Sequence, residues 1–485
     1  MTEPFERHNI ARLTLATLAV AMLGACAGLP PPGEAASLAS VPVAAPPPQW
    51  QAALPHSGQL TDLARWWQQF DDPLLTQLIA AAQAVSPTLA TAQSRIAQAR
   101  AARVSAGAAL GPAVNASASA SRGRQDLSLP LGSSASAGLQ AVWELDLFGG
   151  NAAGRDAAQN RLAGAEASWH DARVSVAAEV AGAYVGLRAC EAQLVQTQLD
   201  ARSRAETARL TELAAKAGFQ APANAALARA SAAQGSSLLT QQRAQCDLGV
   251  KSLVALTGLA EPALRSQLAA GSAQLPKPAQ IVITSVPAEA LAQRPDLFSA
   301  AREVLAASAD LSQSQAQRYP RIVLNGSIGA ARFSSGATTL DGTIWSLGPV
   351  SVSLPLFDGG ARHANVEAAR ARYVAASVNY AARLRTAVRE VEEALVALQS
   401  TAARGSDALV ATEGFAASYR ATDARFRGGL ASLFELEDAR RSAVQAQSAL
   451  IELQRERVAA WISLYRALGG GWVADEAAAV AAIQD

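Results

Sequence analysis

Reactive side chains are few in this 485-residue chain, which contains three cysteines and four histidines. The histidines, His8, His56, His170 and His363, are too scattered to form metal-ligand spacing with the cysteines. The sequence also contains no phosphate-binding glycine loop and no nucleophile elbow. These patterns do not favour an enzyme, and we expect no metal site and no soluble cofactor.

Two of the cysteines, Cys190 and Cys246, lie almost equally far in sequence from Gly218. If Gly218 is the turn of an antiparallel helical hairpin, both thiols lie at about the same height. A disulfide is then feasible in an oxidising compartment, provided that the Cα atoms lie within roughly 7 Å. The alternative is that both residues are small apolar packing residues.

The third cysteine, Cys26, ends a segment typical of a secretion signal. Arg7 and Arg12 flank a short apolar run, residues 13–23, which is too short to span a bilayer with confidence. Leu23-Gly24-Ala25-Cys26 resembles the bacterial lipobox, in which the cysteine becomes the first residue and carries a diacylglycerol and an N-acyl lipid such as palmitate. We expect residues 1–25 to be a signal peptide. Ala27, in place of an aspartate, indicates the outer membrane by the usual sorting rule for lipoproteins.

A Pro/Ala-rich stretch follows the lipobox. Pro30-Pro31-Pro32 comes almost at once, which argues against the alternative of an anchor helix with an incidental cysteine. We expect residues 26–60 to be the lipidated N-terminus and an extended tether. At roughly 3.1 Å per residue such a tether places the folded body well below the membrane surface.

The composition limits what the folded body can be. A net charge of +1 offers no footprint for nucleic acid. Half of the residues are hydrophobic but only 5% are aromatic, and alanine supplies much of the apolar content. Long helices that approach each other through small side chains fit this composition better than a thick globular core.

The body consists of two similar halves. A strand-like run ends in Leu-Phe and stops at a glycine pair twice, at Phe148 and Phe357, roughly 209 residues apart. The junction glycines are Gly149, Gly150, Gly359 and Gly360. We expect a first helix-strand-strand-helix repeat over residues 61–260, an equatorial connector over 261–287, a second repeat over 288–471 and a C-terminal tail over 472–485. The connector and the tail are expected to form an irregular belt.

Alternating polar and apolar residues predict two strands in each repeat. They cover residues 114–121 and 135–147, and then 321–332 and 343–356, with polar hairpin loops at 122–133 and 333–342. Strands of about ten residues cross a bilayer when they are tilted in a barrel. A soluble sheet with one wet face is the alternative.

Four strands alone leave two sheet edges unpaired, which hydrocarbon does not tolerate, so several chains must close one barrel. Two chains would enclose only side chains, whereas three give about 12 strands and an open lumen. The pattern therefore predicts a mixed α and β membrane protein that is a homotrimer.

A very long helix is expected after each junction, over residues 151–215 and 361–426. Neither stretch contains proline, and at 1.5 Å per residue each reaches roughly 100 Å, a length typical of coiled-coil packing or a helical tube. Each helix turns at glycine, Gly218 or Gly428-Gly429, and returns as a second helix. Near the start of the body, Asp72 before Pro73 predicts a helix N-cap, and the aromatic residues just before it predict a packing plug.

The chain resembles the TolC-like outer-membrane factors, in particular the lipidated NodT-type branch that serves RND efflux pumps. The motifs that carry the resemblance are the lipobox, the two junctions, Trp67-x-x-Phe70-x-Asp72-Pro73-x-Leu75, Arg294-Pro295-Asp296 and Arg427-Gly428-Gly429-Leu430. The resemblance implies a trimer with a 12-stranded barrel in the outer membrane and a long periplasmic α-helical barrel. It also implies a periplasmic adaptor protein and an inner-membrane RND transporter as partners, and passive conduction of what the pump delivers.

In that family an iris of helices closes the periplasmic end, and acidic residues just after the second glycine turn ring its narrowest point. The matching positions here are Glu435 and Asp438, whose i, i+3 spacing puts both carboxylates on one helix face. A symmetric trimer would present six acids, which favour cations. Ordinary solvated carboxylates are the alternative, and Asn224 in the first half adds no charge.

Several further residues are candidates on the same resemblance. Arg420, Asp423 and Arg427 are candidate latch contacts between helices, although each alone is more often a surface charge. Glu437 and Arg441, at i, i+4, fit an ordinary solvated pair. The turns at Gly218, Gly428 and Gly429 are the candidate adaptor contacts. Two rival functions stay open: the exit duct of type I protein secretion, and a periplasmic coiled-coil scaffold or adaptor, which has no use for membrane-length strands.

Overall fold

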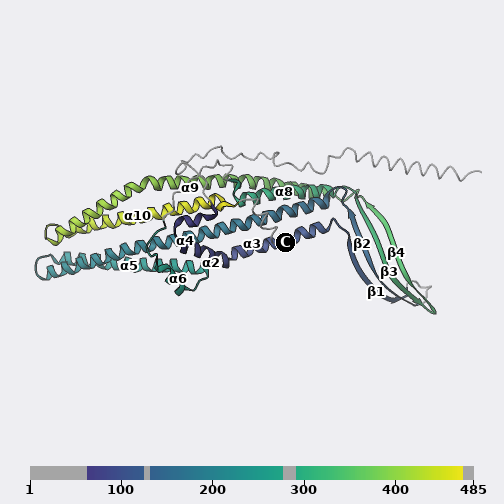
Figure 1. The fold of residues 1–485 in the computed structure, drawn as a ribbon, viewed down its shortest axis with the longest axis horizontal. Coiled ribbons are helices and arrows are strands. Elements are labelled where there is room, and N and C mark those ends of the chain that lie inside the picture. Colours follow the sequence, from purple (N-terminus) through teal and green to yellow (C-terminus); the bar gives the residue numbers. More distant parts are fainter. Residues whose placement is uncertain (1–62, 125–130, 277–290, 473–485) are drawn as a thin grey trace, which may run out of the picture. The chain divides into compact units, whose positions relative to one another are not determined.

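The computed structural model describes residues 63–124, 131–276 and 291–472 (Figure 1). The predicted signal peptide, Cys26, the predicted tether and nearly all of the predicted tail lie outside the described residues. The chain divides into two compact units. Within the described part, the first unit holds residues 100–124, 131–160 and 303–377, and the second holds 63–99, 161–276, 291–302 and 378–472. Among the described helices, none is both long and apolar enough to cross a membrane.

The first unit contains a four-stranded antiparallel sheet in the order β1-β2-β3-β4 (Figure 1). The strands are β1 (Ala113–Gly123), β2 (Gly132–Leu145), β3 (Arg321–Ser335) and β4 (Thr338–Ser353). The two halves of the chain meet in the middle of the sheet, where β2 pairs with β3 and Ala141 stands opposite Gly326. The prediction of four strands from two repeats is therefore confirmed.

The register separates the two faces of the sheet by polarity. Leu139 stands opposite Ile328, which in turn stands opposite Trp345, so one face is apolar. On the other face hydroxyl pairs cross between strands. Ser119 and Ser136 are 2.9 Å apart, and Ser327 and Ser346 are 2.8 Å apart (oxygen to oxygen). The alternation of the sequence is thus expressed as one largely apolar face and one face that carries the hydroxyl pairs together with Phe333, Leu340 and Ile344.

The predicted loop over residues 333–342 was wrong. β3 runs on to Ser335 and β4 begins at Thr338, so a tight turn replaces the loop. Gly336 adopts a φ of 61° there, which lets the chain reverse, and the threonines after it favour strand. At the other end β4 stops at Ser353 rather than at residue 356, because Pro355 cannot donate to a ladder.

The helices that follow the two hairpins begin at aspartate caps. α3 (Pro87–Ala108) and α8 (Pro295–Ala316) precede the two hairpins, and α4 (Gly150–Lys216) and α9 (Ala361–Arg427) follow them. At the first junction the carboxylate of Asp146 accepts from the backbone N–H groups of Asn151, at 3.1 Å, and Ala152, at 2.7 Å.

At the second junction the carboxylate of Asp358 accepts from the backbone N–H groups of Gly360, at 3.0 Å, and Arg362, at 3.2 Å. Each carboxylate satisfies donors that the first helical turn cannot pair internally, and carries negative charge to the positive end of the helix dipole. An aspartate side chain therefore caps the long helix at each junction, although Asp146 and Asp358 stand at different positions before the glycine pair.

The second unit is made of two long helical hairpins and short helices against them. α4 turns into α5 (Pro222–Thr257), and α9 turns into α10 (Leu433–Ala467). The remaining elements are η4 (Leu63–Phe70), α2 (Pro73–Val85), α6 (Glu261–Ala269) and η5 (Gly469–Gly471). The bounds of α4 and α9 match their predicted spans to within one residue at each end.

Aromatic residues from the start of the body are part of the largely aliphatic core of the second unit. Trp66 and Trp67 are buried, and their rings lie against those of Trp461 and Tyr465, with centroids 6.2 Å apart for Trp66–Trp461 and 4.7 Å apart for Trp67–Tyr465. Asp72 caps α2 by accepting from the N–H groups of Leu74 and Leu75, at 3.1 and 3.2 Å. The predicted packing plug and N-cap are both confirmed.

The prediction of an irregular connector from residue 261 was wrong over its first part. Glu261–Ala269 is the helix α6, and its Leu264 and Leu268 are buried. Pro262, at the first turn, and Glu261, in that turn, are the start signals of a helix, and both were visible in the sequence. Residues 277–290 of the connector lie outside the described residues.

Candidate functional site

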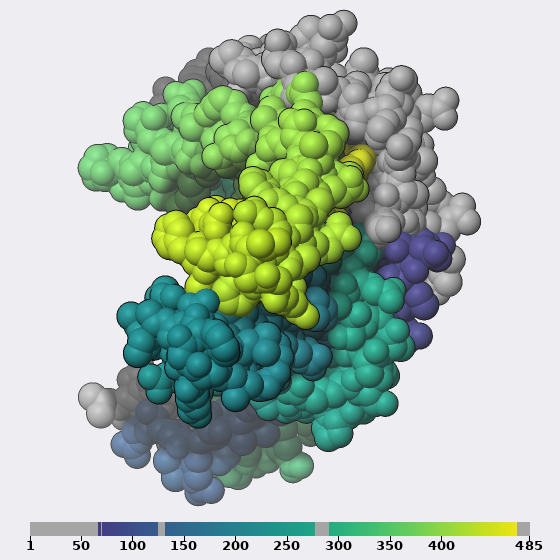
Figure 2. Space-filling view, turned by 90° about the vertical axis from the view of Figure 1, so that its left-hand side faces the viewer, coloured from purple at the N-terminus to yellow at the C-terminus, as the bar shows by residue number. Residues whose placement is uncertain are grey.

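The turns of the two hairpins lie next to each other in the second unit (Figure 2). Gly218, with a φ of 82°, ends α4, and the N–H of Phe219 donates to the carbonyl of Ala214 at 2.9 Å. Gly429, with a φ of 74°, ends α9, and the N–H of Leu430 donates to the carbonyl of Arg425 at 2.8 Å. Only a left-handed residue closes a helix in this way, which explains glycine at both turns.

A small apolar cluster joins the two turns. It consists of Ala208 on α4, Ala228 on α5 and Leu433 on α10, all buried. At the tips themselves the large apolar side chains are exposed instead, to 84% for Phe219 and 73% for Leu430. The hairpins are thus held together just behind tips that present apolar side chains outward.

Glu435 is held by a capping box at the start of α10. Its carboxylate accepts from the backbone N–H of Ser432 at 2.6 Å, and the Ser432 hydroxyl accepts from the backbone N–H of Glu435 at 3.2 Å. The hydrogen bond from the Ser432 backbone, followed by that from its side chain, lowers the pKa of Glu435. Glu435 is therefore exposed but fixed, and stays ionised into the acidic range.

Within the described part of the chain, Asp438 and Asn224 pair only with side chains of their own segment. Asp438 forms an ion pair with Arg441, three residues later on the same helix, and both side chains are exposed. Asn224 donates through its side-chain nitrogen to Gln220 at 2.9 Å. The predicted pair between Glu437 and Arg441 was wrong. Arg441 pairs with Asp438 instead, because the Glu437 carboxylate faces inward toward Arg440 and Arg204.

Behind the turns a buried ionic network links both hairpins, and its centre is Arg440 on α10. The Arg440 side chain is 1% exposed, forms an ion pair with Glu437, and donates to the Thr207 hydroxyl on α4 at 2.7 Å. Its guanidinium also lies over the Tyr419 ring of α9, 5.7 Å from the ring centroid. One side chain of α10 thereby contacts both α4 and α9.

Arg204 on α4 extends the network to α5. Its guanidinium donates to Asp200 at 2.8 Å and to the Ser231 hydroxyl of α5 at 2.9 Å, and lies 3.6 Å from Glu437 of α10. The Ser231 hydroxyl donates on to Glu437 at 3.0 Å. All four long helices therefore meet in one set of polar contacts, which we call the inter-hairpin network (Asp200, Arg204, Thr207, Ser231, Tyr419, Glu437 and Arg440).

Sequence reasoning missed this network. The only signals were the spacings Asp200–Arg204 and Glu437–Arg440, which solvated helix faces also show.

The candidate latch residues behave differently: Arg427 pairs with Asp423 at 3.0 Å and Arg420 donates to the carbonyl of Ala416 at 3.2 Å, both contacts within α9. In the described part of the chain, these hydrogen bonds and ion pairs of the three residues therefore stay within α9.

Farther from the turns, Cys190 on α4 and Cys246 on α5 form a disulfide, with Cα atoms 5.6 Å apart. Gln242 donates to the Cys190 carbonyl at 3.3 Å beside it. The bond crosses the hairpin at the height expected from equal distances to Gly218. It ties the two arms of the α4–α5 hairpin covalently.

The Arg294-Pro295-Asp296 motif has a structural role. Arg294 is buried, and its guanidinium binds Asp296 at 2.7 Å, Glu390 at 2.8 Å and the carbonyl of Ala467 at 2.9 Å. It connects the start of α8 with α9 and the end of α10. Among the described residues there is no group of His, Cys, Asp and Glu that could hold a metal ion.

The fold and these contacts define a class of protein: a sheet of four membrane-length strands, built from a duplicated unit, on long paired helices. The chain belongs to the outer membrane efflux protein family, whose sequence model matches residues 78–259 and 286–470. The two matched stretches correspond to the two repeats. The chain is accordingly an efflux channel of the outer membrane.

Relatives and solved structures agree. The chain is 31% identical to the pyoverdine export outer membrane protein OpmQ of Pseudomonas putida, over 89% of this chain and 93% of that protein. It is 32% identical to the outer membrane protein OprJ of Pseudomonas aeruginosa, over 74% of this chain and 76% of that protein. The solved outer-membrane channel OprN, 28% identical, superposes with a TM-score of 0.79 over 88% of this chain and 98% of its own. VceC of Vibrio cholerae, 26% identical, superposes with a TM-score of 0.74 over 84% of this chain and 99% of its own.

Proposed function

We propose that three copies of this chain close one barrel, each contributing four strands, so that 12 strands enclose an open lumen. The observation that carries the proposal is the sheet itself. Within it β1 and β4 each have a neighbour on one side only, and its apolar face suits lipid. Unpaired strand edges are not tolerated in hydrocarbon, so the edges of neighbouring chains pair with each other.

The hairpin turns form the periplasmic gate of this channel. Glu435 and Asp438 lie one helical turn apart at the start of α10, so three chains bring six acids to the pore axis. Arg441 offsets part of this charge through its pair with Asp438, whereas Glu435 forms no ion pair with any described residue and is held by Ser432. The gate therefore prefers cations, chiefly through Glu435.

The inter-hairpin network keeps the gate closed at rest. Opening moves one hairpin past the other, and the contacts of Arg440 to Thr207 and of Glu437 to Arg204 and Ser231 must then change. Contact with a periplasmic adaptor and an inner-membrane RND transporter supplies the free energy for that change. The exposed tips at Gly218, Gly428 and Gly429 are the docking points for the adaptor.

The channel is passive, and small molecules delivered by the pump leave through it. Relatives are named for export of pyoverdine and for efflux of toluene and solvents, all of them small molecules. A lipid on Cys26 anchors each chain to the outer membrane. Replacing Cys26 with serine should abolish incorporation of labelled palmitate.

Ion selectivity of single channels in planar bilayers tests the gate. Wild type should give small cation-selective currents, and the double variant Glu435→Gln/Asp438→Asn should lose that selectivity. Glu413→Gln, which removes an exposed acid from α9 away from the turn, is the matched control and should keep it. Unchanged selectivity in the double variant would refute the acidic gate, and no current from any of the three proteins would refute the channel.

A further inference from the structure

The apolar face of the sheet has a defined length. Residues that stand opposite each other in the register share a face, and this one runs from the row of Leu145 and Ile322 to the row of Ala137 and Ala330. On β3 that is the stretch from Ile322 to Ala330, close to the roughly 9–11 residues that a tilted barrel strand needs to cross hydrocarbon. The next row should therefore lie at a headgroup layer.

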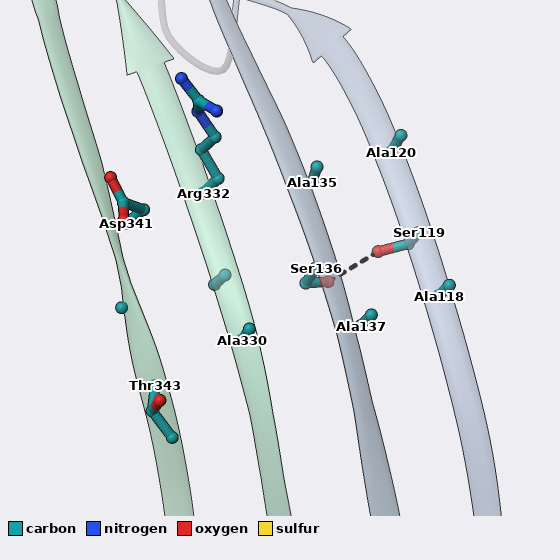
Figure 3. A pocket seen from close by; sticks show the side chains of 12 residues that line it. Ala118, Ser119, Ala120, Ala135, Ser136, Ala137, Ala330, Arg332, Asp341 and Thr343 are labelled. Carbon is teal, nitrogen blue, oxygen red and sulfur yellow. Dashed lines mark hydrogen bonds between the residues drawn. The ribbon is translucent and has the colours of Figure 1, made fainter.

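That next row is the first on this face to carry charge. Its members, from β1 to β4, are Ala120, Ala135, Arg332 and Asp341. The row beyond it consists of Arg122, Ser133, Ser334 and Thr339. In Figure 3 the Arg332 side chain extends toward the C-terminal end of β3, away from the apolar band. These rows lie at the hairpin ends of the strands, opposite the ends that join the helices. Because the helices extend into the periplasm in the proposed channel, the rows lie at the level of the outer leaflet.

A hollow of about 410 Å³ lies between the two arginines. Its lining includes Arg122, Arg332 and the serines Ser133 and Ser334, and is completed by Ala120, Ser121, Ser134 and Ala135. Guanidinium groups and hydroxyls are donors whose geometry matches phosphate oxygens, and arginine binds them with two parallel hydrogen bonds. The hollow therefore has the chemistry of a phosphate site, set directly above an apolar band.

We propose that this arginine–serine patch (Arg122, Ser133, Arg332 and Ser334) binds the headgroup of a phosphorylated lipid of the outer leaflet. The inference rests on the proposed barrel, which brings the apolar face to the lipid. The stem of each arginine lies along the hydrocarbon while its guanidinium reaches the headgroup layer. The apolar rows beneath hold the acyl chains, which a soluble phosphate lacks.

Charge complementarity supports the lipid as occupant. Asp341 stands opposite Arg332 and offsets part of its charge, whereas the row of Arg122 contains only hydroxyl side chains besides the arginine. The patch thus keeps a net positive charge facing a leaflet of anionic phosphates. Basic clusters at a membrane surface bind anionic lipids for the same reason.

Lipid retention by the purified protein tests the proposal. The full-length protein in a zwitterionic detergent is titrated with diphosphorylated lipid A, and bound lipid is measured by native mass spectrometry. Arg122→Gln/Arg332→Gln should bind about tenfold more weakly than wild type, since two charge-assisted contacts are lost. Arg243→Gln, an exposed arginine of α5, is the control and should bind as wild type does.

Two further measurements separate the possible outcomes. Arg122→Lys/Arg332→Lys keeps the charge without the planar fork and should show intermediate binding. Excess inorganic phosphate should not displace the lipid. Equal lipid binding by wild type and the glutamine variant, or displacement by inorganic phosphate, would overturn the proposal. Because single-channel conductance is recorded on the same samples, failure of the channel proposal would appear as absent current in wild type, independently of the lipid result.

Discussion

The two helical hairpins of the second unit have the same layout but are stabilised differently. The α4–α5 hairpin is crosslinked by Cys190–Cys246 and begins its return helix at Ala221, which gives no side-chain cap. The α9–α10 hairpin begins its return helix at Ser432 in a capping box and carries the acids Glu435 and Asp438. Among the described residues it has no disulfide.

This difference assigns a role to each hairpin. A covalent bond keeps the arms of α4–α5 at a fixed height, so that hairpin is suited to act as the stationary part. The α9–α10 hairpin is held by hydrogen bonds and ion pairs, which can be exchanged without breaking a covalent bond. We therefore expect α9–α10 to be the moving element and the inter-hairpin network to be the contact at which it moves.

Removing the centre of the network should have the largest effect. Arg440→Ala deletes a buried cation that contacts Glu437 and Thr207, and Glu437 keeps only its contacts to Arg204 and Ser231; breaking a buried pair in this way typically costs about 3–5 kcal/mol. Urea unfolding of the purified protein measures the loss. Arg441→Ala is the neighbouring control and should cost no more than about 1 kcal/mol, because its pair with Asp438 is exposed. Equal losses in the two variants would contradict the network.

Breaking the disulfide should destabilise one hairpin selectively. Cys190→Ala/Cys246→Ala opens a loop of sequence separation 56 and should cost roughly 2–4 kcal/mol, mainly by freeing the unfolded chain. Hydrogen exchange resolved by peptide should then rise in α4 and α5. If exchange rises equally in α9 and α10, the disulfide stabilises the whole unit and the contrast between the hairpins fails.

Exchanging the caps tests the two return helices against each other. Ser432→Ala removes the hydroxyl that accepts from the Glu435 N–H, and should cost about 1 kcal/mol. Ala221→Ser introduces a cap where α5 lacks one, and should gain up to about 1 kcal/mol. Thermal unfolding of both variants is the measurement, and shifts of the same sign would argue against the assignment of the caps.

The pH dependence of selectivity should show the smallest effect. The hydrogen bond from the Ser432 backbone lowers the pKa of Glu435 below its usual value of 4.5, so the charged form is favoured in the folded gate. The contribution of this charge is therefore present above pH 4.5 and lost only as the pH falls through the lower folded pKa. Cation preference measured in a pH series should persist at pH 4.5. Its disappearance already above that pH would show that Glu435 is not the controlling acid.

The long elements were predictable because local rules decide them. α4 and α9 contain no proline, and their ends are set by Gly218 and Gly429, so the predicted bounds were close. The strands were predictable from the alternation of polar and apolar residues, which is kept wherever one face of the sheet is apolar. The wrong loop over residues 333–342 came from reading Thr339 and Asp341 as loop residues, although β4 continues through them to Thr338.

The candidate site was predictable only in part. The resemblance to the TolC-like family pointed to Glu435 and Asp438 as gate candidates, but the sequence did not show that Ser432 holds one and Arg441 the other. Arg440 and Glu437 could not be recognised, because a helix that packs on three others buries polar residues that a lone amphipathic helix would expose. Burial of this kind depends on which helices meet, and that is a tertiary property.

The pairing of β2 with β3 also bears on how such a chain arose. Each repeat supplies one hairpin of two strands, and the sheet joins the hairpins of the two repeats side by side. A half-length ancestor with a single repeat would have needed six copies to supply 12 strands, with six seams between separate molecules. Gene fusion converts every second seam into the β2–β3 ladder within one polypeptide. Only three seams then depend on the meeting of separate chains, which lowers the concentration dependence of assembly.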